Sequence, residues 1–113
     1  MAADDVVWRS AVECAALIRR KELSPVELTE AVLARIDAVN PRLNAFCLVA
    51  HDVARRLARE AEIAVMKGEP LGLLHGVPVS VKDVLFTRGM RTTGGSRFYA
   101  DRRLGVGCKN LIG

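Results

Sequence analysis

A lysine at the end of a short apolar run is the residue best placed to do chemistry. Residues 77–82 alternate as in a β-strand, so three valines share one face and Pro78, Ser80 and Lys82 share the other. The carboxyl end of a strand is where ligands usually bind in α/β sheets. Apolar surroundings favour the neutral amine of a lysine, which can then act as a general base or form a Schiff base. The same pattern equally fits an ordinary surface lysine that closes a strand.

The cysteines and histidines do not have the spacing of a metal site. The three cysteines include no C-x-x-C pair, and neither His51 nor His75 has ligand spacing to any of them. No signal peptide opens the chain, and no run approaches the roughly 18 apolar residues that span a bilayer. We therefore expect no metal, no membrane partner and reduced thiols in the cytoplasm. The cysteines are Cys14, Cys47 and Cys108.

The net charge of +4 comes from one end of the chain. Residues 1–85 hold 11 Lys and Arg against 12 Asp and Glu, whereas residues 86–113 hold six against one. A nucleic-acid-binding tail would also be basic, but glycine and threonine interrupt this one and no known nucleic-acid-binding module surrounds it. Composition therefore does not predict a nucleic-acid partner.

The first part of the chain predicts two helices. Residues 10–21 have helical spacing and end in three cations, which suit a helix C-terminus. Ser24 should cap the second helix, with Pro25 at its first position and Glu27 completing a capping box. Pro41 with the preceding asparagine should end it. The inward residues expected on these helices are Ala11, Cys14, Ala15, Ile18, Leu28, Val32, Ile36 and Val39.

Residues 44–82 are predicted to form a strand, a helix and a second strand. Residues 44–49 form a short apolar run typical of a strand, and Asp52 should cap a helix over residues 53–67 that ends at Gly68. With the strand at residues 77–82, this order predicts an α/β fold. Two strands do not make a self-sufficient sheet, so we expect the fold to be incomplete in this chain. The inward residues expected on the last helix are Ala54, Leu57, Ala58, Ala61 and Val65.

Several separated motifs resemble one enzyme family. Residues 74–83 read LHGVPVSVKD, which resembles the LHG-[IV]-P-x-x-[IV]-K-D stretch around the catalytic lysine of the amidase-signature family. Upstream, residues 23–27 and 36–46 resemble the N-terminal helices of that family and the strand behind them. Downstream, residues 89–96 resemble its G-x-x-T-T-x-G-S segment. The resemblance covers about residues 8–101 and keeps the order of the motifs.

The resemblance implies that residues 1–113 are the N-terminal fragment of a single amidase domain. That domain would be α/β/α with a central mixed sheet, and its reaction would be amide hydrolysis by a Ser–cisSer–Lys triad without metal or cofactor. Lys82 takes the position of the base in that triad. A bridging serine with a cis peptide bond would pass it the proton of the nucleophilic serine, which attacks the amide carbonyl.

Neither family serine has a counterpart in this chain. The family places them downstream of its lysine, and this chain ends 31 residues after Lys82. We therefore expect the chain alone to be inactive. The resemblance makes Asp83, Thr93, Gly95 and Ser96 walls or supports of the substrate site, with Ser96 not the nucleophile. His75 has no role in this chemistry and should be structural.

Residues 102–113 lack the acidic, proline-containing turn and helix that usually follow in the family. A truncation, a frameshifted gene end and a domain split across chains would each explain this. One alternative function is a non-catalytic binding piece that needs a complementing chain or a second copy of itself. Another is the A subunit of an aminoacyl-tRNA amidotransferase, which would bring tRNA as a partner. The substrate is otherwise a small-molecule amide whose identity the sequence does not reveal.

Overall fold

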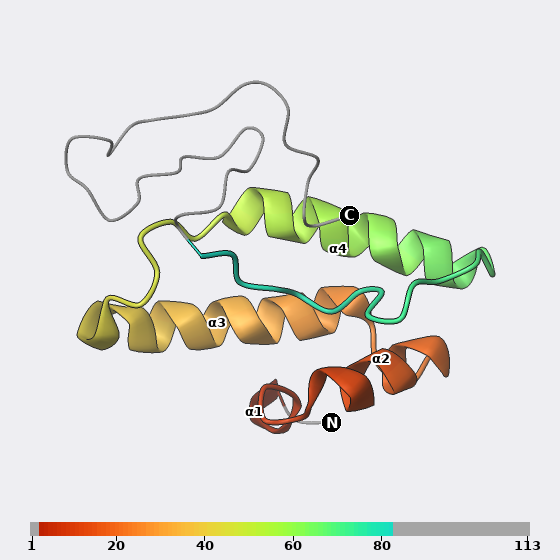
Figure 1. Ribbon diagram of the computed structural model, residues 1–113, viewed down its shortest axis with the longest axis horizontal. Coiled ribbons are helices and arrows are strands. Elements are labelled where there is room, and N and C mark those ends of the chain that lie inside the picture. The colour runs from red at the N-terminus through yellow and green to blue at the C-terminus, as the bar shows by residue number, and fades with distance from the viewer. Residues whose placement is uncertain (1–2, 83–113) are drawn as a thin grey trace. The chain divides into compact units, whose positions relative to one another are not determined.

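Residues 3–82 are described by the computed structural model, and all their regular secondary structure is helical (Figure 1). The helices are α1 (Ala3–Val6), α2 (Ala11–Arg19), α3 (Pro25–Leu43) and α4 (His51–Met66). The chain divides into two compact units, Met1–Pro78 and Val79–Gly113. All four helices belong to the first unit, and residues 79–82 are the described part of the second.

The core of the first unit is aliphatic and joins the helices. α3 lies alongside α4, and α1 packs against α3 (Figure 1). Ile18 of α2 and Pro25 of α3 are the largest fully buried side chains. Burying a large aliphatic side chain stabilises a fold by about 1.5–3 kcal/mol, so this cluster is the main source of stability. Its buried members are Val6, Cys14, Leu17, Ile18, Leu23, Leu28 and Val65.

Most of the predicted inward positions of the helices are at least partly buried. The exception is Ala11, which is exposed at the start of α2. It is the first residue of α2. The predicted residues that are fully buried are Cys14, Ala15, Ile18, Leu28, Ala58 and Val65.

α2 confirms the helix predicted over residues 10–21, although it ends two residues earlier. The Ser10 hydroxyl accepts from the Glu13 amide at 3.1 Å, and the Glu13 carboxylate accepts from the Ser10 amide at 3.2 Å. The two bonds close a capping box and satisfy two amides that the helix leaves free. Arg20 caps the other end, and Lys21 follows in the left-handed region with φ 60°.

The start of α3 is as predicted, except for the capping box. Ser24 accepts from the Val26 amide at 3.0 Å, and Pro25 takes the first turn, where a missing N–H costs nothing. Glu27 was expected to complete the box, but among the described residues the Ser24 hydroxyl accepts from the Val26 amide and not from the amide of Glu27. The same hydroxyl donates to the Glu62 carboxylate of α4 at 2.5 Å. The cap therefore joins α3 to α4.

The prediction that Pro41 ends α3 was wrong. The helix continues through Pro41 to Leu43, because a proline this close to the end removes a single amide donor. Asn44 ends it instead, with φ 50° and its amide bonded to the Asn40 carbonyl at 2.7 Å. The Asn40 side chain then holds the backbone of Phe46 through bonds of 2.9 and 3.1 Å.

α4 begins at His51, so the prediction of Asp52 as its cap was also wrong. Asp52 lies in the first turn, and Ala50 at the cap position makes no side-chain bond. His51 stabilises this end, since its ring lies 3.0 Å from the Val49 carbonyl and 2.9 Å from Asp37 of α3. Gly68, with φ 72°, follows the other end as predicted.

Neither strand predicted within the described residues forms. Residues 44–49 and 77–82 have no regular secondary structure. A strand needs a neighbour to bond its amides and carbonyls, and residues 3–82 offer none. The backbone of Phe46 bonds the Asn40 side chain instead, and the Val77 amide closes a turn. The sheet of the expected α/β fold is therefore not seen in this part of the chain.

Candidate functional site

The chain turns back after α4 and runs past the helices again before it reaches Pro78 (Figure 1). We call residues 71–77 of this segment the strap. Turn bonds shape it, with the His75 amide 3.3 Å from the Gly72 carbonyl and the Val77 amide 3.1 Å from the Leu74 carbonyl. Leu71 and Val77 pack against the buried core cluster. The strap is therefore apolar at both ends and folded tightly between them.

Two side-chain hydrogen bonds attach the strap to α2 and α4. Arg19 of α2 donates through Nη2 to the Gly72 carbonyl at 2.7 Å. The Nε2 atom of His75 lies 2.9 Å from the carbonyl oxygen of Ala61 on α4. The Arg19 bond is exposed and the His75 bond is partly buried, so water competes less with the second. His75 has the structural place that the sequence suggested for it.

Gly76 brings the strap against the start of α3. Its φ is +80°, and a Cβ atom there would lie 2.8 Å from Cγ of Pro25 and 3.2 Å from Cδ1 of Ile18. Glycine satisfies both demands, because it adopts positive φ without strain and has no Cβ. A glycine in a turn-rich stretch signals such a φ, but no local pattern identifies a partner 51 positions earlier in the sequence. The bond from Arg19 is long-range in the same way.

Lys82 is exposed, as are Val79 and Ser80, whereas Val81 is partly buried. The alternation expected for a strand would place all three valines in a core. Val79 is 51% exposed, so within the described residues the apolar face does not extend beyond Val77. A lysine base needs apolar surroundings to hold the neutral amine, and an exposed lysine lacks them.

The other predicted site residues lie outside the part of the chain that the structure describes. These are Asp83, Thr93, Gly95 and Ser96, the expected walls and supports of a substrate site. Their expected role, like that of Lys82, stays a prediction. Cys108 and the basic stretch near the C-terminal end also lie outside the described residues.

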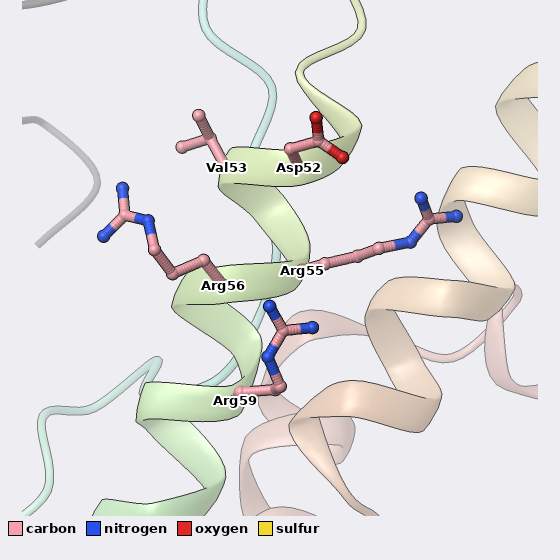
Figure 2. A pocket seen from close by; sticks show the side chains of 5 residues that line it. All are labelled: Asp52, Val53, Arg55, Arg56 and Arg59. Carbon is pink, nitrogen blue, oxygen red and sulfur yellow. The ribbon is translucent and has the colours of Figure 1, made fainter.

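Charged side chains on α4 face α3 and solvent. Arg55 donates to both oxygens of Glu30 at 2.7 and 3.3 Å, and this bond lowers the pKa of Glu30 and raises that of Arg55. Arg56 pairs with Glu60 along the helix at 3.3 Å. Together with Arg59, Asp52 and Val53, these arginines line an open hollow (Figure 2).

The hollow on α4 lacks the geometry of an anion site. Figure 2 shows Arg55 directed toward the neighbouring helix and Arg56 away from it, so the guanidinium groups diverge. Arg55 and Arg56 already have carboxylate partners. A phosphate site needs donors that converge on one point, so we assign no anion-binding role to the hollow.

Within residues 3–82, no cluster of three His, Cys, Asp or Glu side chains could hold a metal ion. Cys14 is buried in the core, and burial raises the pKa of its thiol. None of the helices in the same residues has the length and apolarity needed to cross a membrane. The candidate functional residues are the strap in the first unit and Lys82, which follows it in the sequence.

The strap and Lys82 both lie inside a match to a known family. Residues 27–104 match the family model described as Amidase, which is well over half of the chain. The chain belongs to the amidase family. The matched span also includes the four predicted site residues beyond Lys82 and nearly all of α3 and α4.

Curated relatives and one solved structure agree with the family. The A subunit of glutamyl-tRNA(Gln) amidotransferase from Salinispora tropica is 50% identical over 99 residues, which are 88% of this chain and 20% of that protein. An acylamidase of Rhodococcus erythropolis is 41% identical over 101 residues, 89% of this chain and 21% of that protein. The crystal structure of a bacterial aryl acylamidase of the amidase-signature enzymes shares 38% identity and a TM-score of 0.85, over 89% of this chain and 21% of that one. The chain thus spans about a fifth of the length of these amidase-family proteins.

Proposed function

We propose that this chain supplies the lysine base of an amide hydrolase, and that Lys82 is that base. The observation that supports the proposal is the position of Lys82 inside the amidase-family match, five residues beyond a strap anchored on three helices. The acylamidase and aryl acylamidase relatives favour a small-molecule amide as the substrate class. The reaction is proposed for a complete domain, since the chain spans about a fifth of these relatives.

In the proposed mechanism the neutral amine of Lys82 accepts a proton relayed by a cis-serine from a nucleophilic serine. The serine oxygen then attacks the amide carbonyl, and backbone N–H groups stabilise the oxyanion. The amine or ammonia leaves with a proton, and water releases the acid from the acyl-enzyme. Asp83, Thr93, Gly95 and Ser96 would wall or support the substrate site. No metal or cofactor takes part, and this chain without the two serines would not turn over.

The proposal assigns the helices of residues 3–82 to the outer layer of an α/β/α domain with a central mixed sheet. Residues 77–82 would become a strand once neighbouring strands bond their amides and carbonyls. The same neighbours would cover Val79 and Lys82, which are now exposed. Removal of water from the amine would then favour its neutral form, as a base requires.

Two assays test the proposal. The purified 113-residue chain should not hydrolyse simple aryl or alkyl amides. If it does, and if Lys82→Ala abolishes the hydrolysis, the proposal that the chain is inactive by itself is wrong. The second assay joins residues 1–101 to the rest of the Rhodococcus acylamidase and measures aryl acylamide hydrolysis. Lys82→Ala should lower kcat about 10²–10⁴-fold, the usual effect of losing a general base. Lys67→Ala, at an exposed lysine after α4, is the matched control. Equal activity of the two variants would refute the role of Lys82.

A second function is favoured by the relatives named as the A subunit of glutamyl-tRNA(Gln) amidotransferase, three of which are 48–50% identical to this chain. Under this alternative the same lysine would act within a multi-subunit complex that modifies glutamyl-tRNA(Gln). The discriminating assay grafts residues 1–101 onto the rest of the Salinispora protein with its partner subunits. The amidotransferase is favoured if this second graft transfers an amide group to glutamyl-tRNA(Gln) and the graft on the acylamidase does not hydrolyse aryl acylamides.

A further inference from the structure

We infer that His75 and Gly76 are positioning residues for Lys82. They hold the strap on the helices, and so they fix the end of the first unit from which the chain continues to Lys82. The inference rests on the role proposed above for Lys82. It also goes beyond that role, because it assigns a function to residues that take no part in proton transfer.

The His75 bond ties the strap to the middle of α4. Its Nε2 atom lies 2.9 Å from the Ala61 carbonyl, within a helix that is itself held to α3 by Ser24 and Glu62. A carbonyl accepts only, so Nε2 must carry a proton. Both the imidazolium and one neutral tautomer provide it. The bond is partly buried, so water competes with it less than with the exposed bond from Arg19.

Gly76 fixes the strap at the next residue. Its Cα packs so closely on Pro25 and Ile18 that a methyl group would not fit, and both of these residues are fully buried. Neither partner can move easily, because the Pro25 ring is rigid and Ile18 lies at the centre of the core. The adjacent residues His75 and Gly76 therefore fix the strap to α4, α3 and α2 together.

Val77 and Pro78, the next two residues, restrict the backbone between the strap and Lys82. Val77 packs on the core, and Pro78 both fixes its own φ near −65° and restricts the residue before it to extended conformations. Four peptide units separate Pro78 from Lys82, so the Cα atoms lie within about 14 Å of each other. A rigid departure point thus limits the volume that the lysine can reach. A base must be held at hydrogen-bond distance from its partner, so this restriction matters for catalysis.

Hydrogen exchange of the intact 113-residue chain tests the inference without any substrate. The variants are His75→Leu, which removes the donor, and His75→Gln, whose amide nitrogen can replace Nε2. We expect His75→Leu to raise exchange of the two bonded amides of the strap, those of residue 75 and Val77, by roughly three- to tenfold, the usual effect of one net hydrogen bond. Residues 11–16 of α2 should exchange as in the wild type, and His75→Gln should restore most of the protection. His75→Asn, which is too short to reach Ala61, decides the question if His75→Leu does not fold.

The outcomes separate this inference from the proposed function. Unchanged exchange of the amides of residue 75 and Val77 in the folded variant, or an equal rise in α2, would overturn it. In the acylamidase graft, His75→Leu should lower kcat without changing KM, and His75→Gln should recover the rate. If hydrolysis depends on Lys82 but His75→Leu alters neither exchange nor kcat, the positioning role is wrong. If exchange responds as expected while Lys82→Ala leaves hydrolysis intact, the anchor exists but the proposed function fails, and with it the positioning role.

Discussion

Gly76→Ala should destabilise the chain more than the same substitution at either of the other two glycines in residues 3–82. Gly76 has φ +80° and lies against Pro25 and Ile18, whereas Gly68 has φ +72° with nothing within 4 Å of the position that a methyl group would take. Gly72 has neither a positive φ of this kind nor a near neighbour. The three glycines therefore separate backbone strain from steric overlap.

The magnitudes follow from these two effects. Left-handed backbone costs a non-glycine residue about 1–2 kcal/mol, and this cost applies to Gly68 and Gly76 alike. Overpacking a rigid core adds about 1–3 kcal/mol, and it applies to Gly76 alone, since its Cβ would lie 2.8 Å from the Pro25 ring. Gly76→Ala should thus lower the free energy of unfolding by about 2–5 kcal/mol. At Gly72 alanine should stabilise slightly, by about 0.4–1 kcal/mol, because it restricts the unfolded chain.

Urea unfolding followed by circular dichroism measures all three variants on one scale. A lower midpoint with an unchanged m-value shows a change in stability and not in the unfolded ensemble. The decisive quantity is the difference between Gly76→Ala and Gly68→Ala, expected to be about 1–3 kcal/mol. If the two variants are equally stable, the close packing of the strap on Pro25 does not constrain the chain, and the reasoning is wrong.

Three further predictions concern the helices. Ser10→Ala should lower the free energy of unfolding by about 1 kcal/mol in urea, since it removes the hydroxyl that accepts from the Glu13 amide, whereas exposed Ser80→Ala should change nothing. Arg55→Gln should raise the pKa of Glu30 toward its ordinary value in a carboxyl NMR titration. Because the pKa of Glu30 is lowered in the folded wild type, the stabilisation by Arg55 is present at pH values above the pKa of Glu30 in the unfolded chain. It disappears as the pH falls through the pKa of Glu30 in the folded protein. A difference in unfolding free energy between wild type and variant that does not change with pH would contradict this. Iodoacetamide at pH 7.5 should modify exposed Cys47 well before Cys14, whose burial raises its thiol pKa, and equal rates in the native protein would be evidence against the buried position.

The helices were predictable because their signals are local. Ser24 was predicted to cap the helix that follows it and Gly68 to follow the last helix, because each of these signals needs only its immediate neighbours in sequence. The errors have local causes too. Pro41 was expected to end α3, but a proline near the C-terminal end removes one bond, and Asn44 provides the better cap. Helix ends are decided by such small competing energies.

The strands were not predictable, because a strand depends on residues elsewhere. Apolar alternation at residues 77–82 describes a segment able to join a sheet, and residues 3–82 contain no strand for it to pair with. The anchors of the strap are long-range in the same sense. Ala61 and Pro25 lie 14 and 51 positions before their partners His75 and Gly76, so no periodicity connects them.

Three of the residues that precede Lys82 in the motif are explained by the fold of the first unit and not by the chemistry. His75 bonds the Ala61 carbonyl, Gly76 provides the positive φ and the close approach, and Pro78 stiffens the exit. These demands would be the same if Lys82 were an ordinary surface lysine. The number of residues between Pro78 and Lys82 has no such structural explanation, because folding of the first unit does not require a lysine at a fixed position after Pro78. The number of residues between the strap and Lys82 is therefore the one part of the motif that only the proposed chemistry requires.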